Sequence, residues 1–198
     1  FSRFVMSTSS LPPVTPALMP TYARQPVAFV RGEGVWLWDT DGKRYLDTTA
    51  GIAVCGLGHA NPVVAAAIAD QAATLVHTSN LYRVPLQEEL ADLLCQVSGM
   101  THAFFGNSGA EANEAAIKLA RLHGHKKGIA VPTIIVMENS FHGRTMATLT
   151  ATGNAKIQEG FGPLVQGFVR VPFDDLDAIR KVAAENPNIV AILVEPIQ

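Results

Sequence analysis

Apolar residues near the N-terminus occur in short runs that are separated by turn-forming residues. Val27–Val30, Val35–Trp38 and Arg44–Asp47 are rich in β-branched and aromatic side chains, which favour strands. An Asp-Gly pair at residues 41–42 favours a hairpin between the last two runs. The pattern predicts a small antiparallel meander, preceded over residues 6–26 by an irregular arm rich in Ser, Thr and Pro.

From Asn61 onward the apolar spacing becomes that of amphipathic helices. Asn61 is a favourable N-cap and Pro62 suits the first helical position. Glu114 and Lys118 stand four residues apart, as in a helical ion pair. Four helices are expected. The first has an apolar face formed by Val64, Ala67, Ile68 and Leu75, and the second has one formed by Leu86, Leu90, Leu93, Leu94 and Val97. The third runs from Gly109 to about His123, and the fourth begins after Asp174 or Asp175.

Short apolar runs alternate with these helices in the rest of the chain. Strands are predicted at His102–Phe105, Thr133–Met137, Phe168–Val171 and Ile189–Val194. Strands without polar alternation that are separated by helices are typical of an α/β fold with a mainly parallel sheet. We therefore expect an arm and meander over residues 1–60 and an α/β region over residues 61–198.

Composition excludes several classes of protein. The 198 residues are 48% hydrophobic and 16% charged with a net charge of −2, which argues against a disordered chain and against a nucleic-acid-binding surface. Two cysteines form neither a disulfide framework nor a four-cysteine metal site, so a reducing, cytoplasmic environment is expected. We also expect no metal site, no secretory signal and no membrane span.

The turn Gly106-Asn107-Ser108-Gly109-Ala110 joins a predicted strand to a helix and is the first candidate site. Free backbone N–H groups and the positive end of the helix dipole would bind an anion there, most often a phosphate. An ordinary strand–helix connection remains open. So does a serine hydrolase, with Ser108 as nucleophile and His142 as base, although Ala110 departs from the G-x-S-x-G pattern.

Two further candidates follow predicted strands, at the sheet edge where ligands bind in parallel α/β folds. In Phe141-His142-Gly143-Arg144, the aromatic ring suits stacking on a flat ligand and the guanidinium suits a carboxylate. Glu195 follows the last strand and suits orienting a ligand group or neutralising an arginine. A loop with a core Phe, a capping His, a solvated Arg and a surface Glu is the alternative.

These segments occur together in an order that resembles the class III aminotransferases, which depend on pyridoxal 5'-phosphate (PLP) and have the type I transferase fold. The resemblance covers residues 19–198, nearly the whole chain. It includes Trp38-Asp-Thr-Asp-Gly, Gly51-Ile-Ala-Val, Gly58-His-Ala-Asn-Pro, His77-Thr-Ser-Asn, Asn107-Ser-Gly-Ala-Glu-Ala-Asn-Glu-Ala, Phe141-His-Gly-Arg and Val194-Glu-Pro-Ile-Gln.

The resemblance implies a role for each matching residue. Ser108, Gly109 and Ala110 would bind the phosphate of PLP, Phe141 would stack on its ring, and Arg144 would bind the substrate α-carboxylate. Glu195 and His142 would support the site. The resemblance further implies a homodimer, with Asn80 and Tyr82 near the partner's site. The expected reaction moves an amino group from N-acetylornithine or a related ω-amine to 2-oxoglutarate, in arginine biosynthesis.

The resemblance assigns no catalytic residue to this chain. The family's Schiff-base lysine and the aspartate that pairs with the pyridine nitrogen fall beyond Gln198, and none of the six lysines stands in a matching context. We therefore expect an N-terminal portion of the type I fold, with part of the large domain, that is inactive by itself. A non-catalytic module that binds a phosphate ligand is the alternative function.

Overall fold

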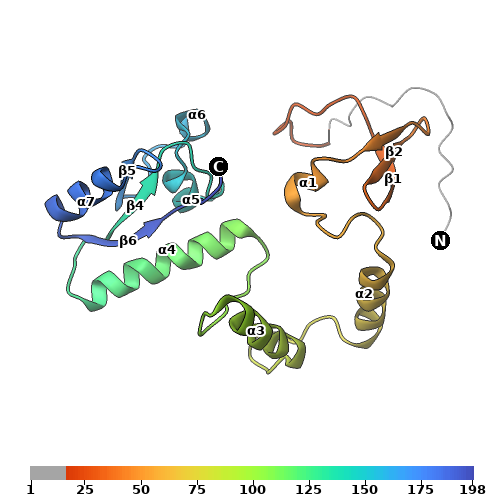
Figure 1. Ribbon diagram of the computed structural model, residues 1–198, viewed down its shortest axis with the longest axis horizontal. Helices are drawn as coiled ribbons and strands as arrows, with labels where there is room; N and C mark the ends of the chain where they lie inside the picture. The colour runs from red at the N-terminus through yellow and green to blue at the C-terminus, as the bar shows by residue number, and fades with distance from the viewer. Residues whose placement is uncertain (1–16) are drawn as a thin grey trace. The chain divides into compact units, whose positions relative to one another are not determined.

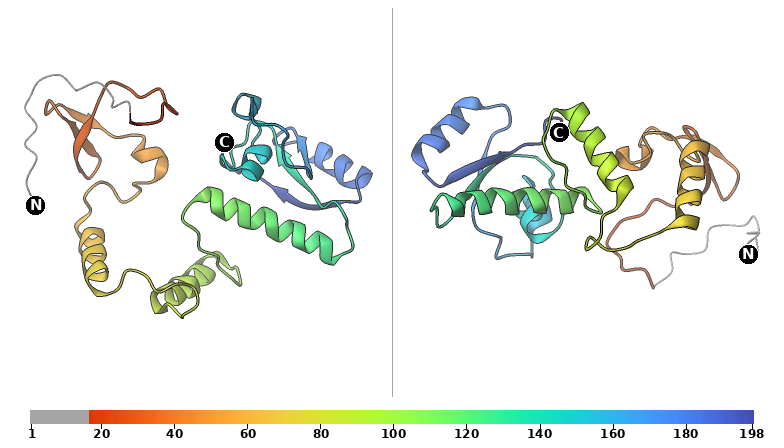
Figure 2. Two further views of the ribbon diagram at one scale, coloured as in Figure 1. Left: turned by 180° about the vertical axis from the view of Figure 1, so that it is seen from behind. Right: turned by 90° about the horizontal axis from the view of Figure 1, so that it is seen from below.

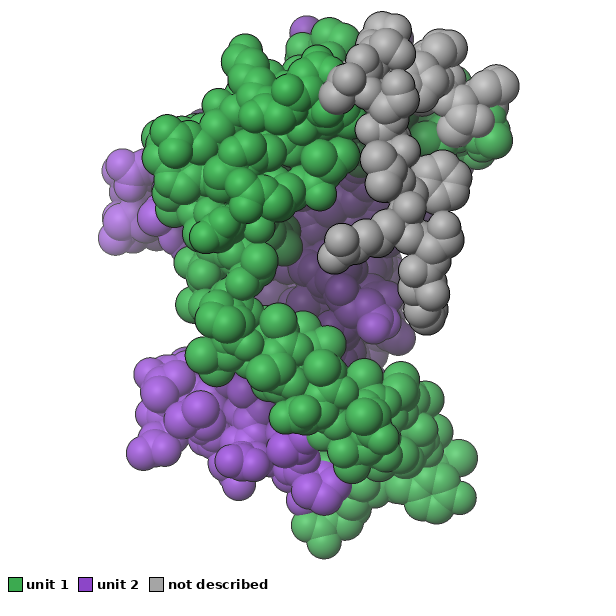
Figure 3. All heavy atoms as spheres, turned by 90° about the vertical axis from the view of Figure 1, so that its right-hand side faces the viewer, with its two compact units in different colours: residues 1–84 green, residues 85–198 purple. Residues whose placement is uncertain are grey.

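A computed structural model describes residues 17–198. The chain divides after Val84 into two compact units, of which the described parts are residues 17–84 and Pro85–Gln198 (Figure 3). The predicted arm lies outside the described residues as far as residue 16, and residues 17–28 contain no helix or strand. The predicted boundary after residue 60 stays a prediction. Each unit is described separately below.

The first unit begins with the predicted meander. Strands β1 (Phe29–Glu33), β2 (Trp36–Asp39) and β3 (Arg44–Leu46) pair antiparallel in that order (Figure 1). The Asp39 carboxylate closes the second hairpin, because it accepts hydrogen bonds from the Asp41 and Lys43 N–H groups, each at 2.9 Å, and from the Tyr45 hydroxyl at 2.8 Å. Burial acts to raise the pKa of Asp39, but these hydrogen bonds outweigh it and lower the pKa.

A left-handed turn follows the meander and was not predicted. All four residues of α1 (Ala50–Ala53) have positive φ, between 48° and 65°, a region that side chains with a Cβ rarely adopt. Asp47 holds the turn: it accepts the Ala50 N–H at 2.8 Å and lies 2.7 Å from Nε2 of His59. The hydrogen bond with His59 is the largest cause of the lowered pKa of Asp47.

Helix α2 (Pro62–Thr74) begins where the sequence predicted. The side-chain oxygen of Asn61 accepts the N–H groups of Val63 and Val64 at 3.0 and 3.3 Å, which confirms the N-cap. No residue of α2 is buried, and the same holds for α3 (Pro85–Ser98) at the start of the second unit. Both helices therefore leave their apolar faces uncovered within residues 17–198.

The second unit is built on a parallel sheet with the order β5-β4-β6, which confirms the expected α/β fold. All five residues of the central strand β4 (Thr133–Met137) are buried. Ile134 and Val136 pack with α4 (Gly109–Lys126), while Ile135 and Met137 pack with α7 (Leu176–Glu185). Helices therefore cover opposite faces of the sheet (Figure 2), whose other strands are β5 (Phe168–Val171) and β6 (Ile189–Leu193).

Besides the turn at α1, four elements differ from expectation. The strand expected at His102–Phe105 is wrong, because this segment has no backbone partner within residues 17–198 to form a ladder. Helix α4 runs past His123 to Lys126, and a Cβ atom on its Gly124 would lie 2.7 Å from Pro132 and 2.8 Å from Val190. Helices α5 (Met146–Ala151) and α6 (Ala155–Gln158) were missed, because six and four residues are too few to show a repeated helical spacing of apolar residues.

Candidate functional site

The N-terminus of α4 forms the anion-binding geometry that the sequence predicts. Ser108 is the N-cap: its hydroxyl oxygen accepts the N–H of Glu111 at 3.2 Å, and its carbonyl accepts the first helical bond, from Ala112. The N–H groups of Gly109 and Ala110 have no acceptor within the described chain. Two donors at the positive end of an 18-residue helix are therefore available to an anion.

Glu111 closes the turn that precedes this helix. Its carboxylate accepts the backbone N–H of Asn107 and, at 3.4 Å, the side-chain amide of the same residue. A Cβ atom on Gly106 would lie 3.2 Å from Cβ of Glu111, so glycine gives this carboxylate room. The turn is thereby fixed while Ser108 and Gly109 remain exposed.

The loop after β4 carries Phe141, and hydrogen bonds of two hydroxyl groups hold the residues on either side of Phe141. The Ser140 hydroxyl donates to the Met137 carbonyl at 2.8 Å, and the His142 N–H donates to the hydroxyl of Thr152 at 2.9 Å. The side chain of Phe141 nevertheless points out of the core, because the residue is 53% exposed. Arg144 is also exposed.

The structure brings Phe141 and Glu195 together, as their positions after neighbouring strands suggested. The Phe141 N–H donates to the Glu195 carboxylate at 3.0 Å, across the carboxyl ends of β4 and β6. This hydrogen bond joins two segments that are 54 residues apart in sequence. Glu195 therefore holds the backbone of the loop that presents the Phe141 ring.

His142 is buried, with 4% exposure, and its Nε2 atom has no hydrogen-bond partner within residues 17–198. Burial lowers the pKa of this imidazole, and the negative charge of Glu195 acts in the opposite direction. The ring is thus neutral at pH 7. No hydrogen bond joins His142 to the Ser108 hydroxyl in the described chain, so the nucleophile–base pair that a serine hydrolase needs is not formed.

Two site residues that sequence reasoning missed lie on α4. Asn113 donates from its side-chain amide to the His142 carbonyl at 2.8 Å, and Glu114 accepts the hydroxyl of Thr145. The predicted ion pair between Glu114 and Lys118 is absent from the described residues. A signal was present: Ala110, Asn113, Glu114 and Ile117 have the spacing of one helix face, and Ile117 lies in the core.

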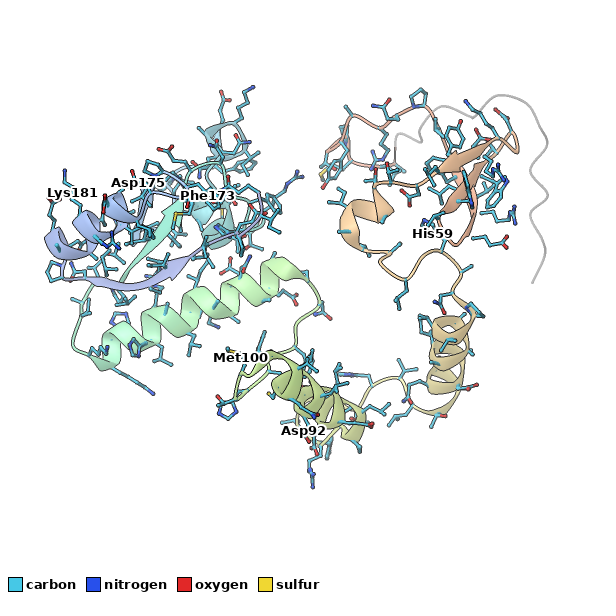
Figure 4. All side chains as sticks on the ribbon, viewed as in Figure 1. His59, Asp92, Met100, Phe173, Asp175 and Lys181 are labelled. Carbon is cyan, nitrogen blue, oxygen red and sulfur yellow. The ribbon has the colours of Figure 1, made fainter. Side chains whose placement is uncertain are left out.

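Residues that the resemblance placed near the partner's site, and one of the six lysines, are exposed. Asn80 and Tyr82 are exposed in the segment between α2 and α3, and Lys181 is exposed on α7 (Figure 4). Within residues 17–198 no group of three or more His, Cys, Asp or Glu side chains is suited to a metal ion. No helix in this range is both long enough and apolar enough to cross a membrane.

Comparison with known proteins gives a consistent family. The family described as "Aminotransferase class-III" matches residues 18–198. An acetylornithine aminotransferase from Nitrosomonas europaea is 67% identical over 181 residues, which cover 91% of this chain and 46% of that protein. A second, from Gloeobacter violaceus, is 57% identical over 182 residues, or 91% of this chain and 45% of that protein. The chain thus spans about half the length of the curated relatives that it matches.

A solved structure is similar over nearly the same range. The ornithine aminotransferase of Toxoplasma gondii, with partial occupancy of PLP at its active site, superimposes with a TM-score of 0.88 and 31% identity. The similarity covers 92% of this chain and 43% of that chain.

Proposed function

Since the chain belongs to the class III aminotransferase family, we propose that it supplies the phosphate-, ring- and carboxylate-binding residues of a PLP-dependent aminotransferase. Its two units are part of the type I fold of these enzymes, as the resemblance implied. One observation carries the proposal: at the Ser108-capped N-terminus of α4, two N–H donors have no acceptor within residues 17–198. The loop Phe141–Thr145 is hydrogen-bonded to the same helix.

The residues present fit PLP. The N–H groups of Gly109 and Ala110, together with the helix dipole, suit its phosphate dianion, and the hydroxyl of Ser108 stands beside them. The exposed ring of Phe141 suits stacking against an aromatic heterocycle. When bound, PLP supplies an electron sink for the carbanion formed at the substrate carbon.

Side chains of this chain then bind the substrate and orient the cofactor ring. Arg144 binds the α-carboxylate of the amino donor and afterwards a carboxylate of the keto acceptor, because its planar guanidinium matches a carboxylate in a bidentate geometry. Phe141 shields one face of the ring from water, and Glu195 fixes the backbone from which Phe141 projects. His142 supports this loop as a buried neutral group.

The substrates and assembly follow from the relatives' names and from the family. We propose N-acetylornithine or a related ω-amine as donor and 2-oxoglutarate as acceptor, a place in arginine biosynthesis, a cytoplasmic homodimer, and Asn80 and Tyr82 near the partner's site. No lysine of this chain lies in the α4 turn or in residues 138–145. We therefore propose that the reacting lysine belongs to a part of the protein outside these 198 residues.

The test is an assay of the protein expressed from its complete gene and loaded with PLP. Glutamate formed from N-acetylornithine and 2-oxoglutarate supports the proposal, whereas PLP binding without amino transfer contradicts it and favours the non-catalytic phosphate-binding module.

Substitution of Arg144 tests the carboxylate-binding role directly. A hydrogen bond to a charged group contributes about 1.5–3 kcal/mol, so Arg144→Ala is expected to raise KM for 2-oxoglutarate by about tenfold or more. Arg180→Ala is the matched control, because Arg180 is exposed on α7 and pairs only with Asp177 among the described residues. An unchanged KM in Arg144→Ala would exclude this role.

A further inference from the structure

Two polar side chains stand on the face of α4 that otherwise packs against the core. Asn113 and Glu114 are both partly buried, between Ala110 at the start of the helix and Ile117 in the core. Polar groups on such a face destabilise a protein unless they are hydrogen-bonded. Their partners therefore indicate what these residues do.

Both side chains reach the loop after β4, at two different points. Asn113 donates to the His142 carbonyl at 2.8 Å. The Glu114 carboxylate accepts the Thr145 hydroxyl and, at 3.4 Å, the N–H of Thr148, the residue whose own hydroxyl lies 2.7 Å from that of Thr145. Arg144 and Gly143 lie between the two anchored residues.

Close packing holds the middle of the same loop. A Cβ atom on Gly143 would lie 2.9 Å from Cβ of Ala110 and 2.6 Å from the hydroxyl oxygen of Thr148. Ala110 carries one of the two free N–H donors at the N-terminus of α4. The loop therefore rests directly on the residues that form the anion-binding turn.

We propose that Asn113 and Glu114 are positioning residues, which hold Arg144 in register with the anion-binding end of α4. This inference rests on the proposed function, because it takes Arg144 as the group that binds the substrate carboxylate. One rigid helix carries the turn at Ser108–Ala110 and, within about one helical turn, both anchors of the loop. The distance between the bound phosphate and the bound carboxylate is thereby set by a single element.

Positioning of this kind affects substrate binding more than cofactor binding. A displacement of about 1 Å at a reacting centre can reduce the rate by about a hundredfold. Loss of the Glu114 carboxylate removes the bond that ties Thr145, the residue next to Arg144, to α4. It leaves the contacts of Thr145 with Thr148, the Ser108 cap and the N–H groups of Gly109 and Ala110 in place. A substitution of Glu114 should therefore weaken substrate binding while leaving PLP binding nearly unchanged.

The experiment compares Glu114→Ala with Glu114→Gln in the PLP-loaded protein expressed from its complete gene. In Glu114→Ala we expect KM for 2-oxoglutarate to rise by about tenfold, with the Kd of PLP changed by less than about threefold, since the lost bond is a charge-assisted one. Glu114→Gln keeps an oxygen acceptor and is expected to restore KM to within about threefold of the wild type.

A second variant keeps the test decisive if Glu114→Ala fails to fold. Thr145→Val removes the hydroxyl that Glu114 accepts and should raise KM for 2-oxoglutarate in the same way. The double variant should be little worse than the more affected single variant, because both changes remove the hydrogen bond between Glu114 and Thr145. Glu185→Ala, at an exposed glutamate ending α7, is the control and should change neither constant.

Two outcomes overturn the inference. If thermal stability falls while KM for 2-oxoglutarate stays within about twofold in both Glu114→Ala and Thr145→Val, the contacts are structural only. If the wild-type protein transfers no amino group, the proposed function fails first and this inference fails with it. Wild-type activity with unchanged variants refutes the positioning role alone.

Discussion

A Cβ atom on Gly143 would contact two neighbours at once, the Thr148 hydroxyl and Ala110, and the residue has φ of 132°. We expect Gly143→Ala to lower the free energy of unfolding by about 2–4 kcal/mol, because strain and overpacking add. Gly128→Ala is the control: its φ is 80° but nothing lies within 4 Å, so about 1 kcal/mol is expected. Urea unfolding measures both, and equal losses would mean that packing at Gly143 does not matter.

Protonation of His142 should destabilise the fold. Burial lowers its pKa, so a proton binds more tightly to the unfolded chain, where the ordinary value is 6.5. The stability contributed by the neutral ring is complete above pH 6.5 and is lost as the pH falls through the lower pKa of the folded state. The loss is at most about 1.4 kcal/mol per pH unit for one proton.

Unfolding curves at about pH 7.5 and about pH 5 test this expectation for His142. His142→Leu should lose less stability between the two conditions than the wild type does, because the hydrogen bonds of residue 142 come from its backbone and are retained. His102→Leu, at an exposed histidine, should behave like the wild type. The same pH dependence in His142→Leu would assign the effect to other groups.

Among single residues, the sequence predicted those that are recognisable from their type and from their position next to a predicted helix or strand. Ser108 lies at the start of a predicted helix, and Glu195 follows β6 near Phe141. Asn113 and Glu114 were missed because their partners lie 29 to 34 residues away, on a loop whose path no local pattern reveals. Glu114 was assigned instead to the local partner that helical spacing offers.

The start of α4 combines two roles that a substitution can separate. Aspartate is as good an N-cap as serine, but its charge repels a phosphate. Ser108→Asp should therefore keep the free energy of unfolding of the cofactor-free protein within about 0.5 kcal/mol, and Ser108→Ala should lower it by about 1 kcal/mol. The Kd of PLP should rise by more than about tenfold in Ser108→Asp.

Asp175→Ala is the matched control for this experiment. Asp175 caps α7 by accepting the Ala178 N–H at 2.8 Å, away from the anion-binding turn (Figure 4). The Asp175→Ala substitution should lower the free energy of unfolding by about 1 kcal/mol and leave the Kd of PLP unchanged. Unaltered PLP affinity in Ser108→Asp would show that the phosphate binds elsewhere.

Elements with a local cause were predicted, and those that depend on neighbours were not. Asn61 and Asp175 cap helices where the sequence places them, since each cap is satisfied within three residues. The segment His102–Phe105 is apolar but has no pairing partner among the described residues, so it forms no strand there. Residues 148–151 of helix α5 are buried, and this burial could not be predicted from a sequence that is rich in threonine.

On the scale of the whole molecule, α3 presents an apolar face that nothing covers within residues 17–198. Leu90 and Leu94 are 46% and 40% exposed, and Leu86, Leu93 and Val97 more so. Exposed apolar patches of this kind mark association surfaces. We expect these 198 residues, produced alone, to sediment as more than a monomer.

The doubly substituted chain with Leu90→Lys and Leu94→Lys should return to the monomer, because two charges would be desolvated in any contact over this face. Asp92→Lys is the control, since Asp92 lies between the two leucines in sequence and therefore on the opposite side of the helix. A monomeric parent chain in sedimentation would contradict the expectation.

Helix α4 both carries the anion-binding turn and contacts the loop after β4, which matters when segments of related sequences are exchanged. Residues 138–152 do not form an independent cassette, because Ala110, Asn113 and Glu114 contact them through Gly143, His142 and Thr145. A chimera that imports this loop to change the accepted keto acid must import the facing side of the helix as well. We expect divergence at these two segments to proceed through paired substitutions, and crossovers placed between residues 114 and 142 to yield inactive hybrids.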